Sequence, residues 1–295
     1  MKNDSVSHVQ VMSLGHSGST LMNLLLGTHP DFVSLGEVMH SFMYELKNPE
    51  AQCSCGEPAS TCVFWGKVLH QVSAETQLDI PKGYQVIFET FQAIYPAAEK
   101  QFADSSKSLE VIKLLNSKLK RPLKVVFVMR DVRSYTISQI DNLSRKFSSF
   151  NTKDKIFRNS LIRSRFYFYL DWYYRNLRIR KFLERENIAY IQVGYEELCL
   201  RPDIVLGKIF EFLKVADCLP EDSLKIAAPS QSESHIIRSN RMRLQKGKQT
   251  LSYDTRWLTR NEWILPAAVF PGIMRFNARE VYANISSAEG KKWSV

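Results

Sequence analysis

A six-residue polar loop, GHSGST at residues 15–20, carries residue types that bind phosphate groups. It follows an apolar segment, residues 9–14, that predicts a strand, and it precedes a predicted helix that extends to about Thr28. The first turn of a helix has unpaired N–H groups and the positive end of the helix dipole, which together favour a bound anion. Glycines let the backbone approach a ligand closely, and hydroxyls add hydrogen-bond donors. The candidate ligands are Gly15, His16, Ser17, Gly18, Ser19 and Thr20.

This loop differs from the phosphate loop of nucleotide hydrolases, which needs the pattern GxxxxGK[ST] with its lysine. Position 16 is histidine, no lysine follows Gly18, and the spacing is different. The sequence therefore predicts a phosphate-binding loop of another kind, with an ordinary strand-to-helix turn as the alternative.

A second candidate anion-binding element lies in KVVFVMRDVRSYTISQI, residues 124–140. Its continuous apolar run, residues 125–129, is typical of a parallel strand that is buried on both faces. Arg130 comes directly after this run, and in open α/β sheets ligands bind beyond the carboxyl ends of the strands. The arginine side chain offers a planar fork of donors that suits phosphate, and Ser138, two helical turns later, adds a hydroxyl.

Together these two elements resemble those of the sulfotransferases that use 3′-phosphoadenosine 5′-phosphosulfate (PAPS), in particular bacterial chains and the tyrosylprotein and carbohydrate sulfotransferases. GHSGSTLMNLLLGTHPD is similar to their 5′-phosphosulfate loop, and MRDVRSYTIS is similar to their 3′-phosphate element. Residues 104–107, 193–213 and 235–243 also resemble segments of related chains, so the resemblance covers most of the chain between Val9 and Trp257. It implies PAPS as co-substrate and 3′-phosphoadenosine 5′-phosphate (PAP) as product, and we expect no metal.

The resemblance also implies catalytic roles. Glu37 stands where related enzymes place a glutamate that acts as general base; the alternative is a rim carboxylate paired with an arginine. Many relatives have Lys or Arg just before the Ser-Gly pair, but this chain has His16, so either His16 or Lys107 would supply the cation that stabilises the leaving phosphate. Arg241 or Arg243 would reach the 3′-phosphate from a lid, unless they are ordinary surface charges.

The elements that must position these residues alternate between strands and helices. A strand is predicted at residues 101–107, and the helix that follows it, at about 108–119, has Asp104 or Ser105 as its N-cap. A long helix at residues 159–186 combines an aromatic face with a basic one. Further predicted elements are strands at 32–35 and 188–193 and a helix within 196–213. We therefore expect an α/β, P-loop-like three-layer fold in which helices cover both faces of a mostly parallel central sheet.

We expect one sulfotransferase-like domain over residues 1–295, with a cysteine-containing insert at about 48–66 and a C-terminal lid or tail at about 230–295. The composition is ordinary for a globular protein, and the net charge of +10 favours an anionic partner without selecting one. The N-terminal MKNDSVSH has no apolar core, and the apolar stretch at 263–274 is short and broken by prolines. We therefore expect a cytoplasmic, bacterial enzyme without a transmembrane segment.

The chain has five cysteines, Cys53, Cys55, Cys62, Cys199 and Cys218, and an odd number argues against a disulfide framework. Three of them cluster in CSCGEPASTC at residues 53–62, but a structural zinc site needs four ligands, and His70 is only a distant fourth. We favour packing in a loop for this cluster over a redox-sensitive local disulfide or a metal site.

These observations predict a sulfotransferase that moves a sulfuryl group from PAPS to a hydroxyl or amine. One alternative is a P-loop-type phosphotransferase or nucleotide kinase, which the missing lysine and the lack of an obvious metal-binding carboxylate pair disfavour. The other is a non-catalytic nucleotide- or nucleic-acid-binding module, which the net charge and the basic helix suggest, although we expect no nucleic-acid partner. The acceptor stays open among glycans, lipids, phenols and peptides, and so does the oligomeric state.

Overall fold

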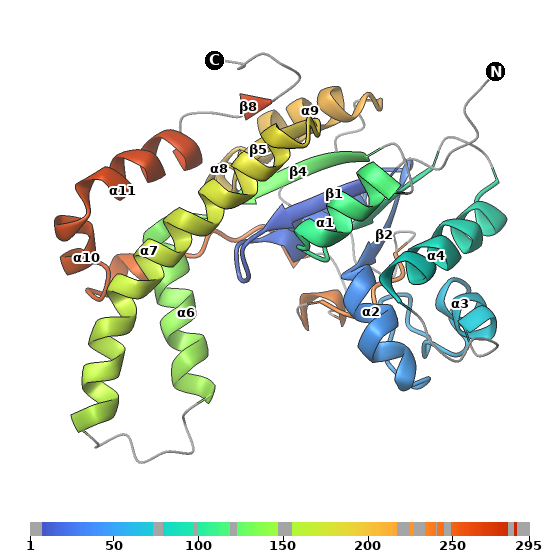
Figure 1. Ribbon diagram of the computed structural model, residues 1–295, viewed down its shortest axis with the longest axis horizontal. Helices are drawn as coiled ribbons and strands as arrows, with labels where there is room; N and C mark the ends of the chain where they lie inside the picture. The colour runs from blue at the N-terminus through green and yellow to red at the C-terminus, as the bar shows by residue number, and fades with distance from the viewer. Residues whose placement is uncertain are drawn as a thin grey trace.

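The computed structural model describes residues 8–72, 79–96, 100–118, 123–146, 155–216, 225–226, 234–239, 241–244, 249–282 and 286–287. Its centre is a six-stranded sheet in the order β2-β3-β1-β4-β5-β8 (Figure 1). The strands are β1 (His8–Ser13), β2 (Phe32–Gly36), β3 (Gln101–Asp104), β4 (Leu123–Met129), β5 (Tyr190–Gly194) and β8 (Ser286–Ser287). The first five are parallel and β8 pairs antiparallel at the edge, which confirms the predicted sheet. A separate pair, β6 (Lys225–Ile226) and β7 (Gln249–Thr250), is antiparallel.

Helices cover both faces of the sheet, so the predicted three-layer arrangement is confirmed. On one face, Val126 and Val128 of β4 pack with α1 (Ser19–Leu26), α8 (Tyr195–Leu200) and α9 (Pro202–Leu213). On the other face, the alternate residues of β4 pack with α6 (Val132–Lys146), α7 (Lys155–Arg185) and α11 (Pro271–Asn277), of which α6 and α7 run side by side (Figure 1). Alternate residues of a strand point to opposite faces, which is why residues 125–129 of β4 are all apolar and buried.

The β2 end of the sheet has its own core. Val33 and Leu35 of β2 pack there with α2 (Val38–Tyr44) and α4 (Ile80–Ile94), and Trp65 belongs to the same cluster. The remaining helical segments are α3 (Trp65–Val72), α5 (Leu109–Lys113), α10 (Ile264–Val269), the 3-10 segments η1 (Glu45–Lys47), η4 (Arg241–Leu244) and η5 (Arg256–Thr259), and the π segments η2 (Leu114–Lys118) and η6 (Ala278–Tyr282).

The predicted N-cap of the helix after β3 is wrong. Helix α5 begins at Leu109, and the Ser108 side chain accepts a hydrogen bond from the backbone N–H of Val111 at 3.3 Å. Asp104 does not cap this helix because its carboxylate is buried and accepts a bond of 2.5 Å from the Tyr84 hydroxyl and one of 2.7 Å from the Ser106 N–H. This carboxylate instead fixes the chain that leads from β3 toward the pocket.

The start of the expected lid lies against the edge strand β2. Ser234 forms a parallel bridge with Ser34, and the His235 N–H donates to the Ser34 carbonyl at 2.8 Å. Farther along, the Glu37 N–H donates to the Arg238 carbonyl at 3.1 Å. Residues 230–233, 240, 245–248, 283–285 and 288–295 of the expected lid lie outside the described residues. The division of the chain into one domain with an insert and a lid stays a prediction.

Candidate active site

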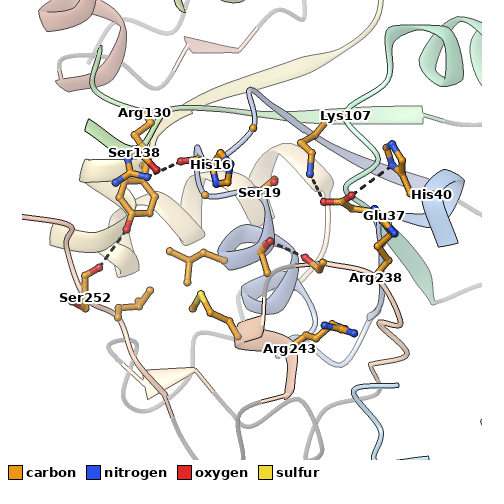
Figure 2. Close-up of a pocket in the computed structure, with 18 of the residues that line it drawn as sticks. His16, Ser19, Glu37, His40, Lys107, Arg130, Ser138, Arg238, Arg243 and Ser252 are labelled. Carbon is orange, nitrogen blue, oxygen red and sulfur yellow. Dashed lines mark hydrogen bonds and ion pairs between the residues drawn. The ribbon is translucent and has the colours of Figure 1, made fainter. Parts of the chain in front are cut away.

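A pocket of about 870 Å³ opens beyond the carboxyl ends of the parallel strands (Figure 2). The sequence-predicted residues that line it are Gly15, His16, Gly18, Ser19, Thr20, Glu37, Lys107, Arg130, Ser138 and Arg243. Ser17 belongs to the same loop but does not line the pocket. It is 1% exposed, and its hydroxyl has no hydrogen-bond partner among the described residues. The side chain of Arg241 lies outside the described residues, although its backbone begins η4.

The polar loop turns between β1 and α1 through two residues with positive φ. His16 has a φ of 64° and Gly18 a φ of 95°, and Gly18 is the N-cap of α1. A Cβ at position 18 would lie 2.5 Å from Cδ2 of Tyr195, so only glycine fits there. The first turn of α1 contains no acidic residue, and its N–H groups and the positive end of its dipole face the loop.

Arg130 is held on three sides at the end of β4. Its guanidinium donates to the carbonyl of His16 at 2.6 Å and to the hydroxyl of Ser134 at 2.9 Å, and it forms an ion pair with Asp254. The guanidinium carbon also lies 4.9 Å from the ring centroid of Tyr195. Arg130 thus joins the polar loop to the C-terminal part of the chain, and nothing in the polar segment around Asp254 predicted this contact from the sequence.

Glu37 and Lys107 face each other on the opposite side of the loop. Nζ of Lys107 lies 2.5 Å from Oε1 of Glu37, and both side chains are mostly buried. Nδ1 of His40 lies 3.5 Å from the other oxygen of Glu37. Burial lowers the pKa of His40, although the charge of Glu37 opposes that shift. Glu37 is therefore paired with a lysine rather than with the arginine of the alternative interpretation.

The family of this chain follows from a match to a known family model. A family model described as the sulfotransferase family matches residues 9–218, which is more than two thirds of the chain and includes both candidate anion-binding elements. The chain belongs to the sulfotransferase family.

Two solved bacterial structures are similar to this chain. The sulfotransferase from Alicyclobacillus acidocaldarius is similar with 16% identity and a TM-score of 0.43, over 74% of this chain and 84% of that one. The sulfotransferase STF9 from Mycobacterium avium is similar with 14% identity and a TM-score of 0.44, over 92% of this chain and 77% of that one. Among curated proteins, none matches this sulfotransferase significantly. In the part of the chain that the structure describes, every helix is too short or too polar to cross a membrane.

Behind Arg130, the sulfotransferase buries two carboxyl groups. Asp131 pairs with Arg133 at 2.6 Å and accepts bonds of 2.8 Å from both Asn277 and Tyr282. Burial favours the neutral form of Asp131, but these partners more than offset it and hold its pKa below the usual range. Glu196 accepts a 3.0 Å bond from the Asp131 N–H, and burial together with the charge of Asp131 raises the pKa of Glu196 to about 8.

The pocket of this sulfotransferase is strongly basic. Its lining contains six arginine and lysine residues, namely Lys107, Arg130, Arg145, Arg238, Arg243 and Arg256, against the two carboxylates of Glu37 and Glu45. Burial lowers the pKa of Arg243. Such an excess of positive charge in a partly enclosed pocket favours a ligand with several negative charges. Ser239, which belongs to the expected lid, contacts the loop directly, since the hydroxyls of Thr20 and Ser239 are 2.7 Å apart.

Proposed function

We propose that this sulfotransferase moves the sulfuryl group of PAPS to a hydroxyl or amine of its acceptor by in-line displacement. The observation that carries the proposal is that the loop at the N-terminus of α1 and the Arg130–Ser138 element line one basic pocket. PAPS carries anionic groups at its 5′ and 3′ positions, and the two elements offer one site for each.

The donor would lie across the pocket. Backbone N–H groups of the loop and the hydroxyls of Ser19 and Thr20 would hold the 5′-phosphosulfate, while Arg130 and Ser138 would hold the 3′-phosphate. Because Arg130 is paired with Asp254, the phosphate would take the place of that carboxylate. Arg243 lines the same pocket and adds charge from the lid, and Arg241 stays a candidate for the same role.

In the transfer step, the acceptor oxygen or nitrogen forms a bond to sulfur while the bond from sulfur to the 5′-phosphate oxygen breaks. The electron pair of the broken bond goes to PAP, and the acceptor proton goes to Glu37. Lys107 or His16 stabilises the charge that develops on the leaving phosphate. When Glu37 takes the proton, it stops neutralising Lys107, so the full charge of that ammonium becomes available at the moment it is needed.

A thermal-shift panel tests the proposal because a ligand that binds only the folded state raises its stability. We expect PAP to raise the melting temperature, and ATP with magnesium or a single-stranded oligonucleotide to have little effect. Stabilisation by ATP with magnesium alone would favour a nucleotide kinase, and stabilisation by the oligonucleotide alone would favour a binding module. A screen of glycans, lipids, phenols and peptides with labelled PAPS would then identify the acceptor. The cytoplasmic, bacterial setting remains the sequence-based expectation.

A further inference from the structure

Three cysteines of the insert and one histidine of the lid meet outside the pocket. Cys53, Cys55, Cys62 and His235 each offer one ligand atom, and all four atoms lie within 4.8 Å of one another. Sγ of Cys62 is 3.8 Å from that of Cys55, 3.6 Å from that of Cys53 and 3.4 Å from Nδ1 of His235. The fourth candidate ligand is thus His235 and not His70.

These separations match the edges of a tetrahedron around a zinc ion. With Zn–S bonds of about 2.3 Å and a Zn–N bond of about 2.05 Å, tetrahedral angles put two sulfurs about 3.8 Å apart and a sulfur and a nitrogen about 3.6 Å apart. The cysteines are free thiols, and their sulfur atoms are too far apart for a disulfide. The four groups therefore surround a space of the size that one ion fills.

We propose that Cys53, Cys55, Cys62 and His235 bind one Zn²⁺ in a tetrahedral structural site. Thiolate and imidazole ligands select zinc over magnesium or calcium, which prefer oxygen ligands. Four protein ligands leave no open position for a substrate, so the ion is structural rather than catalytic. On binding, the three thiols lose their protons to solvent, and the neutral imidazole gives its Nδ1 lone pair to the metal.

The surroundings of the four ligands support this site. Nε2 of His235 lies 3.4 Å from the hydroxyl of Tyr95, which leaves Nδ1 directed at the sulfurs, as expected of a metal-bound histidine with an outer hydrogen-bond partner. The backbone of His235 is fixed by Trp65, whose indole N–H donates to its carbonyl at 2.5 Å. Cys53 begins a tight turn in which the Gly56 N–H donates to its carbonyl at 3.1 Å, and Gly56 has a φ of 100°.

Zinc at this place would fasten the insert to the chain that forms one wall of the pocket. Next to the cluster, the Ser54 N–H donates to the Ile236 carbonyl at 3.0 Å, and the Ile236 N–H donates to the Ser54 hydroxyl at 2.9 Å. Arg238 and Ser239, which follow directly, line the pocket. The metal would thus hold the start of the expected lid, residues 234–239, beside β2. The zinc site does not depend on which nucleotide the pocket binds.

Metal analysis of the full chain, purified without chelators, tests the proposal. We expect about one zinc per chain in the wild type. Cys62→Ser and His235→Ala should lose most of it, whereas His235→Cys, which restores a four-ligand set, should keep it. Cys199→Ser is the matched control, because Cys199 is also buried but lies outside the cluster, and it should retain wild-type zinc. The zinc-free protein should also melt at a lower temperature than the zinc-bound protein.

A second measurement uses the wild type alone and does not depend on the folding of variants. Replacing zinc by cobalt should give the intense visible bands of tetrahedral coordination together with thiolate-to-metal charge-transfer bands. Three results would overturn the proposal: a wild type that holds no zinc after incubation with zinc and gel filtration, equal zinc in the Cys62→Ser and Cys199→Ser proteins, or cobalt spectra without thiolate bands. Peptide mapping that finds a disulfide among the three cysteines of the isolated protein would also overturn it.

Discussion

The two sides of the pocket both place a cation against a carboxylate, but they assemble the pair differently. On the β4 side, which we define as Arg130 and Ser138, the carboxylate is Asp254 from the C-terminal part of the chain. On the β3 side, which we define as Glu37 and Lys107, both members follow strands of the central sheet. In the proposed function, a ligand phosphate would replace the carboxylate on the β4 side, whereas the β3 side would keep its internal pair. We therefore propose nucleotide binding for the first side and proton transfer for the second.

The buried carboxyl groups behind the two sides of the pocket also differ in their partners. Asp131, behind the β4 side, is neutralised by Arg133 and lies next to a second buried carboxyl, that of Glu196. Asp104, behind the β3 side, is held by Tyr84 and Ser106. Burial alone would raise the pKa of Asp104, but His8, Ser106 and Tyr84 together hold it below its usual range. In the described part of the chain, two buried carboxyl groups thus lie behind the β4 side, whereas a single buried carboxylate, held by Tyr84, Ser106 and His8, lies behind the β3 side.

The largest effect is expected from Glu37→Gln on the β3 side. Loss of a general base lowers the turnover number by about 10² to 10⁴, because no group then accepts the acceptor proton. PAP affinity, measured by calorimetry, should stay at the wild-type level because the glutamine occupies the same space. A normal turnover number in the variant would show that Glu37 is not the general base.

Arg130→Ala on the β4 side should act on binding. We expect PAP affinity to fall roughly 100- to 1,000-fold, since several charge-assisted hydrogen bonds disappear together. Arg130→Lys keeps the charge but not the planar fork and should recover only part of the affinity. Arg145→Ala is the control for net charge, because Arg145 lines the same pocket from an exposed position. Equal losses in the Arg130→Ala and Arg145→Ala proteins would contradict a specific phosphate contact.

Glu196→Gln tests the crowded network under the β4 side through its pH dependence. The pKa of Glu196 is raised from 4.5 to about 8, so the folded protein keeps a proton that the unfolded chain releases, and stability falls as pH rises through that window. The glutamine variant lacks this loss and should be more stable than the wild type at pH 8.5, by on the order of 5 kcal/mol, and nearly equal to it near pH 4.

Urea unfolding across this pH range measures the difference between the two proteins. Glu211→Gln, on the exposed surface of α9, is the control and should show no such pH-dependent gap. A constant gap between wild type and Glu196→Gln at every pH would mean that Glu196 is ionised in the folded protein.

Lys107→Ala and His16→Ala separate the two candidate cations. We expect Lys107→Ala to slow single-turnover transfer roughly 10- to 100-fold, because the ammonium lies beside the proposed base and gains influence as that base is protonated. His16→Ala should slow it less, since His16 is exposed on the loop. The reverse order of effects would assign the stabilisation of the leaving phosphate to His16. Unchanged rates in both variants would show that neither Lys107 nor His16 stabilises it.

The smallest effect is expected from Asp254→Asn. Asp254 competes with a ligand phosphate for Arg130, so its removal should tighten PAP binding roughly fivefold, as for the loss of a pair worth about 1 kcal/mol. Although burial opposes ionisation, Arg256 and Arg130 lower the pKa of Asp254 to about 2, so moderate acid cannot substitute for this mutation. Weaker PAP binding in the variant would show that Asp254 orients Arg130 rather than competing for it.

The sequence predicted the central strands and the two candidate anion-binding elements that line one pocket, but not the contacts that distant segments make around them. The run at residues 125–129 is apolar throughout because helices cover both of its faces, and this pattern is visible in one dimension. Asp254 lies in a polar segment without periodicity, and His235 lies 173 residues from Cys62. Contacts such as Asp254 with Arg130 and His235 with Cys62 arise from the packing of segments that are distant in the sequence. A single sequence does not reveal which distant segments pack together.

Gly18 lies against the ring of Tyr195, which in turn contacts Arg130. The ring fills the space where a side chain at position 18 would lie, and the guanidinium carbon of Arg130 is 4.9 Å from the ring centroid. The loop, the Tyr195 ring and the Arg130 guanidinium therefore lie in contact one after another, and the loop can approach the ring because residue 18 has no Cβ. Even the methyl group of alanine at this position would lie 2.5 Å from Cδ2 of Tyr195, whereas a Cβ at Gly15 would have no atom within 4 Å. A Gly18→Ala protein would therefore have to displace either the loop or the ring that contacts Arg130.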